Sequence, residues 1–141
     1  MNFVISTAIG GEVTNEPDTN LRSIIINMAK RLKNGFENVD FVGLNKISIN
    51  LYISGDISEY CNFPGISKVR YIKKKKEISV EFCIQRTYWE TLTEMSLEEK
   101  FWQFISSSLF DLEIEIDKKL KINDFPFEKE KFNAIVEECF N

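Results

Sequence analysis

The 141-residue chain contains no histidine. Histidine is the commonest general base and a frequent metal ligand, because its unperturbed pKa lies near neutrality. Its absence excludes Ser-His-Asp and Cys-His nucleophile systems, as well as histidine-bound zinc and non-haem iron. Chemistry by two carboxylates would need a cleft between them, and no sequence feature marks one. We therefore predict no catalytic residue and no enzymatic activity.

Cysteines and long apolar runs are also scarce. Cys61, Cys83 and Cys139 are widely spaced and form no CxxC pair, so we expect reduced thiols and no metal site. No basic segment or small-residue cleavage site follows Met1, so no signal peptide is expected. The longest apolar runs have only a few residues, too short to span a bilayer. We expect a cytoplasmic protein without a membrane partner, a metal or a cofactor.

The overall composition is that of a folded globular protein. Hydrophobic residues make up 43% of the chain and charged residues 28%, and we find no linker, repeat or low-complexity tract. A chain of this length buries enough surface to fold without disulfides or metals. We predict a single domain over residues 1–141.

The first half of the chain predicts one strand and one helix. Residues 2–9 are apolar and β-branched and end at Gly10-Gly11, which indicates a strand followed by a plain turn. No phosphate-loop motif surrounds these glycines. From Leu21 apolar residues recur at helical spacing, and Asn34-Gly35 is expected to end this helix.

The middle of the chain changes to an alternation of period two. Residues 40–54 predict a half-buried strand, and residues 67–72 and 77–84 predict two more, joined by a turn at Lys73–Lys76. The predicted fold class is α+β. It consists of an antiparallel sheet of about four strands, arranged as strand, helix and three-strand meander, packed against C-terminal helices.

The last third of the chain is predicted to be helical. Ser96 followed by Glu99 resembles a capping box, and apolar residues continue at helical spacing as far as Leu120. Residues 111–117 also alternate like a strand, so residues 111–120 are open to either structure and we favour the helix. A short helix is expected from Glu128.

Charge is unevenly divided along the sequence. Residues 1–85 hold 11 Lys/Arg against 9 Asp/Glu, a net charge of +2, whereas residues 86–141 hold 7 against 13, a net charge of −6. Lys73–Lys76 is interpreted as a solvated hairpin tip, because the whole chain has a net charge of −4. No nucleic-acid partner is predicted.

The acidic stretch has two readings, the solvated side of a helix or a surface that attracts a basic partner. Trp102 lies off the main apolar stripe of its helix and is a candidate binding anchor. The predicted partner-binding residues are therefore Trp102, Glu113, Glu115 and Asp117.

The order of elements, the acidic charge and the helix containing Ser96-Leu97-Glu98-Glu99-Lys100 together resemble bacterial immunity proteins. These are small cytoplasmic inhibitors encoded beside polymorphic and contact-dependent toxins. The resemblance implies binding of one cognate toxin domain, often a basic nuclease, over its active site or beside it. It covers the organisation of the chain and assigns no individual residue.

Two other classes remain open. A secretion-type chaperone or adaptor is also small, acidic and mixed in structure, but such chaperones commonly dimerise and usually begin with a helix. The strand predicted at residues 2–9 therefore favours a monomeric immunity protein. A small enzyme with carboxylate chemistry is disfavoured by the missing histidine.

Overall fold

The computed structural model describes residues 1–10, 19–54, 65–85 and 94–140. Gly11 of the predicted turn and Cys61 lie outside these ranges. The described elements are β1 (Asn2–Gly10), α1 (Thr19–Phe36), β2 (Lys46–Ser54), β3 (Gly65–Ile72), β4 (Glu77–Gln85), α3 (Glu94–Ile122) and α4 (Lys129–Phe140).

The four strands form one mixed sheet in the order β1-β2-β4-β3. β1 pairs with β2 and β2 with β4 in parallel, whereas β3 and β4 form the predicted antiparallel hairpin. The α+β class and the four strands are confirmed, but the purely antiparallel sheet and the meander order are wrong. Alternation of period two is the same for both pairing directions, so it carries no information about them. The crossover through α1 makes β1 and β2 parallel.

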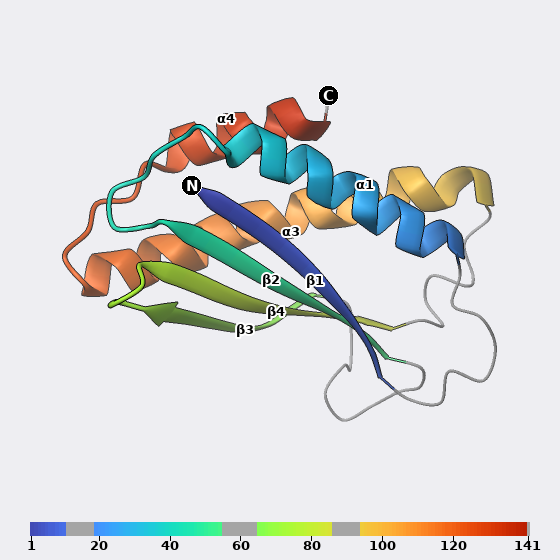
Figure 1. Cartoon of the computed structure of the whole chain (residues 1–141), viewed down its shortest axis with the longest axis horizontal. Helices are drawn as coiled ribbons and strands as arrows, with labels where there is room; N and C mark the ends of the chain where they lie inside the picture. Colours follow the sequence, from blue (N-terminus) through green and yellow to red (C-terminus); the bar gives the residue numbers. More distant parts are fainter. Residues whose placement is uncertain (11–18, 55–64, 86–93, 141) are drawn as a thin grey trace.

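The sheet buries one face beneath the helices. Figure 1 shows α1, α3 and α4 on one side of the sheet, where α1 contacts β1 and α3 contacts β3. No described helix covers the other face, on which Ser6, Asn50 and Glu81 lie side by side and are exposed. The buried face holds Phe3, Ile47, Ile49, Leu51, Ile78, Val80 and Phe82.

α3 is one continuous helix, as favoured from the sequence. The helix places Leu112 and Ile116 in the core and leaves Ile114 51% exposed, which a strand with the same alternation would not do. It begins at Glu94, so Ser96 lies inside the helix and does not cap it. Its buried stripe consists of Phe101, Ile105, Leu109, Leu112, Ile116 and Leu120.

Gly35 has a packing role that the sequence did not predict. α1 continues through this residue to Phe36, so the predicted end at Asn34-Gly35 is wrong. A Cβ at Gly35 would lie 2.5 Å from Cys139 Sγ of α4, which is closer than real side chains approach. The glycine therefore lets α4 dock against α1.

An aromatic cluster joins β1, α1 and α4. The Phe36 ring lies 5.0 Å from the Phe3 ring and 5.2 Å from the Phe132 ring, and Phe41 packs at 6.3 Å from Phe36 and from Phe132. Phe132 is fully buried. This cluster fixes α4 over the end of the fold where α1 finishes.

The cysteines differ from one another. Cys139 is free and buried, whereas Cys83 is disulfide-bonded, so the prediction of three reduced thiols is wrong. Spacing along the chain does not report which cysteines meet in space. Disulfides persist mainly in oxidising compartments, so cysteine usage gives no support for the predicted cytoplasmic location.

Candidate protein-docking surface

All four predicted partner-binding residues lie on α3, but they do not form one face. Glu113 and Asp117 are four residues apart and lie together beside α4, whereas Glu115 lies on the opposite side of the helix. Trp102 lies on the same side as Glu113, about three turns earlier.

Each of the three carboxylates already has a partner within the fold. Asn133 Nδ2 donates to Glu113 Oε2 at 3.2 Å. Lys129 Nζ lies 2.9 Å from Asp117 Oδ2, and Lys118 Nζ donates to Glu115 Oε1 at 3.2 Å. The acidity of this stretch is therefore partly neutralised by α4 and by the following turn of α3.

The ion pair between Asp117 and Lys129 has an electrostatic consequence. The hydrogen bond to Asp117 and its negative charge raise the pKa of Lys129, with a smaller contribution from Glu113. Desolvation of the ammonium acts in the opposite direction, although Lys129 is exposed. The ion pair is therefore favourable at neutral pH and links α3 to α4.

Trp102 is half-buried and held from two sides. The ring of Phe140 meets it edge-on at a centroid distance of 4.8 Å, and the guanidinium carbon of Arg31 lies 4.8 Å from the Trp102 ring centroid. Both arrangements are favourable for an indole ring. The tryptophan is therefore oriented before any partner arrives.

Trp102 lines an open groove between α1, α3 and the end of α4. The groove has a volume of about 770 Å³, within the usual range for binding pockets. Its apolar surface comes from three aromatic rings, and the other lining side chains are polar or charged. The described lining residues are Arg31, Glu99, Trp102, Gln103, Ser106, Ser107, Phe110 and Phe140.

The chemistry available at this groove is that of recognition. Aromatic rings beside Gln103 and Ser107 offer apolar contact together with hydrogen-bond donors and acceptors. Cys139, behind the groove on α4, is not a good nucleophile, because burial raises the pKa of its thiol and keeps it protonated. Among the described residues, no cluster of three or more Cys, Asp and Glu side chains is arranged to hold a metal ion.

Of the residues that line the groove, the sequence predicted only Trp102 as a binding residue. Trp102 was detectable because it falls off the apolar stripe of α3. Arg31 and Phe140 lie more than one hundred residues apart in the chain, and only the docking of α4 on α1 brings them to the same indole ring. No local pattern could have signalled that contact.

The model of a family described as Immunity protein 12 matches residues 1–136. The chain belongs to this family. The resemblance to immunity proteins is thereby confirmed, and the match includes Trp102 and all three carboxylates of α3. Phe140 lies beyond the matched residues. No curated protein and no solved structure matches the chain.

None of the helices within the described ranges is long and apolar enough to cross a bilayer.

Proposed function

We propose that this chain is a bacterial immunity protein that binds and neutralises one cognate toxin domain in the cytoplasm. The observation that carries the proposal is the family match over residues 1–136. It is supported by the groove at Trp102, where a large, pre-oriented aromatic side chain borders open space. Such a residue resembles the anchors that contribute most of the binding energy at protein interfaces.

In this proposal the chain acts as a monomer without enzymatic activity, and its partner is a protein rather than a nucleic acid or a membrane. The groove receives a side chain or a short loop of the toxin. Glu113, Glu115 and Asp117 add negative potential one to two turns along α3, which would attract a basic domain such as a nuclease.

The first experiment uses the C-terminal domain of the toxin encoded beside this chain. Purified chain should abolish the toxic activity at equimolar concentration, and native mass spectrometry should show one copy of each. A stable homodimer that leaves the toxin active and holds an extended client segment would instead favour the secretion-type chaperone.

Substitution at the groove locates the binding surface. Trp102→Ala should weaken toxin binding about tenfold or more, because interface tryptophans are among the residues most costly to truncate. Ile26→Ala is the matched control, since Ile26 is an apolar side chain, 49% exposed, on α1 outside the groove lining. Circular dichroism melting verifies that both variants fold. Equal affinities for the two variants would remove the groove from the interface.

Charge reversal tests the acidic side of α3. The triple variant Glu113→Lys, Glu115→Lys and Asp117→Lys should slow association with a basic toxin domain, most strongly at low salt. Glu137 and Glu138 lie on α4, are exposed, and serve as control positions for the same kind of reversal. Unchanged association at low salt would show that the acidic residues of α3 do not face the toxin.

A further inference from the structure

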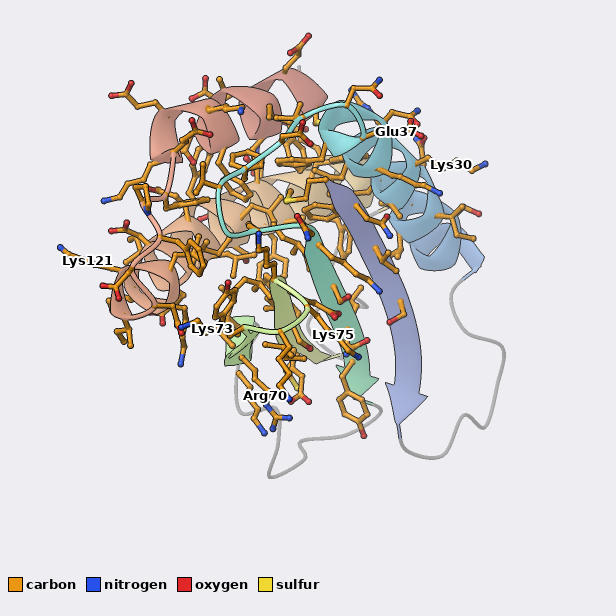
Figure 2. The ribbon with its side chains drawn as sticks, turned by 60° about the vertical axis from the view of Figure 1, so that its left-hand side comes forward. Lys30, Glu37, Arg70, Lys73, Lys75 and Lys121 are labelled. Atoms are coloured by element: carbon orange, nitrogen blue, oxygen red, sulfur yellow. The ribbon has the colours of Figure 1, made fainter. Side chains whose placement is uncertain are left out.

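One end of the fold gathers lysines that are far apart in the sequence. The turn between β3 and β4 contributes Lys73–Lys76, and the last turn of α3 contributes Lys119 and Lys121. Figures 1 and 2 both show this turn beside the end of α3, and Figure 2 shows Lys73 and Lys121 on the same side of the molecule. These six residues are called the lysine-rich end. Residues 86–141 have a net charge of −6, but the lysines at the end of α3 form part of a positively charged region.

The ammonium groups of the lysine-rich end are not neutralised by the fold. Within the ranges that the structure describes, none of the six makes an ion pair with a carboxylate. Neighbouring lysines do have such partners: Lys46 with Glu77 at 3.9 Å, and Lys118 with Glu115 at 3.2 Å. Like charges reinforce one another's potential where they lie within a screening length, which is about 8 Å at physiological salt.

The backbone of the turn is held in place. Lys75 N donates to Ile72 O and Lys76 N to Lys73 O, both at 3.2 Å, while Lys76 O accepts a hydrogen bond from Asn45 N at 2.7 Å. The last of these bonds ties the turn to the residue before β2. The backbone positions from which the four lysines extend are therefore defined.

Lys76 occupies a position where lysine is a poor choice for folding. Its φ is +49°, in the left-handed region where glycine or asparagine is normally found in tight turns. Residues held in an unfavourable backbone conformation, with no compensating side-chain packing, are found mainly at functional positions. A contact of the Lys76 side chain with a partner would account for this choice of residue.

Protection of a sheet edge does not account for these lysines. Edge lysines act when they lie on the edge strand itself. The edge strand β3 already has exposed Lys68 and Arg70, and Lys73–Lys76 lie in the turn beyond it.

A nucleic-acid partner fits the lysine-rich end less well than an acidic protein. Such sites usually combine arginines with aromatic rings that stack on bases. The six residues of the lysine-rich end include no arginine and the adjoining β3 adds only Arg70, while the ring of nearby Tyr71 is half-buried with its hydroxyl donating to Gly43 O at 2.8 Å. The net charge of −4 would also repel a polyanion over the rest of the surface. Ile122, 79% exposed beside Lys121, offers apolar contact of the kind found in protein interfaces.

We propose that the lysine-rich end binds a carboxylate-rich segment of the cognate toxin. This inference rests on the proposed function and adds a second contact to it. The groove and the lysine-rich end lie along one side of α3. This side runs from Gln103 at the groove past Phe110 and the exposed Ile114 to Lys121. That distance is about 27 Å at 1.5 Å per residue, comparable with the width of a standard protein interface. The toxin surface is therefore bipolar, with basic groups facing Glu113 and acidic groups facing Lys121.

The test measures association of the toxin domain encoded beside this chain. The variant Lys73→Glu/Lys121→Glu reverses one charge on each side of the lysine-rich end. The control Lys30→Glu/Lys33→Glu changes the net charge equally and lies on α1, where Figure 2 shows Lys30 away from Lys73 and Lys121. Each pair includes one lysine from the last turn of a helix, so effects on helix stability are matched.

At about 20 mM salt the association rate should fall about tenfold for Lys73→Glu/Lys121→Glu and little for the control, and the difference should shrink at about 300 mM salt. If wild-type chain binds and neutralises the toxin but both variants associate at the wild-type rate, this inference fails and the proposed function stands. If wild-type chain does not bind the toxin, the proposed function itself fails. Tighter binding of wild-type chain to a DNA duplex of about 20 base pairs than to the toxin, lost in the lysine variant, would assign the lysine-rich end to nucleic acid instead.

Discussion

The two charged regions of α3 differ in what the fold does with them. Beside α4, Asp117 is paired with the positive charge of Lys129, whereas Glu113 accepts a hydrogen bond from the neutral amide of Asn133 and keeps its charge. At the lysine-rich end, six described ammonium groups are left without carboxylate partners. Charge counted along the sequence predicted the first region as the docking surface, because such a count cannot distinguish paired from unpaired side chains. What a partner meets is the unpaired charge.

The largest expected effect comes from loosening α4, which supplies the partners of the acidic side. Phe132→Ala removes the fully buried ring that packs against Phe36, Phe41 and Phe127. The free energy of unfolding, measured by urea titration, should fall by about 3–5 kcal/mol, the usual cost of such a truncation. Without a firmly docked α4, Glu113 and Asp117 would lose their partners.

Phe140→Ala is the control for this prediction. Its ring is only half-buried at the groove, so its removal should cost clearly less stability. Equal losses for the two variants would mean that α4 is held by its C-terminal end rather than by the aromatic cluster.

The comparison also shows which parts of the structure a sequence can disclose. The continuous helix α3 was predictable, because its apolar stripe from Phe101 to Leu120 is a local, periodic signal. The parallel pairing of β2 with β4 was not, since it depends on where the chain returns after β3. One residue of the groove, Trp102, was predictable from its position off the apolar stripe. Its contacts with Arg31 and Phe140 were not, because they form only when the helices pack together. The lysine-rich end was hidden because its two halves lie more than 40 residues apart, with acidic residues between them.

A smaller effect is expected at the turn of the lysine-rich end. Lys76→Gly removes the side chain from a left-handed backbone position, so the free energy of unfolding should rise by about 1 kcal/mol. The same substitution removes one unpaired charge and should slow association with the toxin. Stability and association would therefore change in opposite directions, which a purely structural role of Lys76 does not predict.

Lys75→Gly is the matched control for Lys76→Gly. It removes the same charge one residue earlier, where φ is not positive, so it should not stabilise the chain. A stability gain of equal size at both positions would show that the left-handed conformation of Lys76 is not strained.

The smallest effect is expected for the ion pair between Asp117 and Lys129. The effect is a dependence of the melting temperature on pH. The pKa of Lys129 is raised above its ordinary value of 10.5 by Asp117. A group with a raised pKa in the folded state stabilises the fold fully below its unfolded pKa, and that contribution is lost as the pH rises through the folded value. Asp117→Asn should therefore melt slightly below wild type at neutral pH, by little because Lys129 is exposed, and the difference should be lost as the pH rises through the raised pKa of Lys129, which lies above 10.5. Glu115→Gln, which breaks the ion pair with Lys118 within α3 and removes the same charge, is the control.

The same variant also tests which charged region faces the toxin. If Asp117→Asn changes the rate of toxin association more than Lys73→Glu/Lys121→Glu does, the paired carboxylate faces the partner and the unpaired lysines do not.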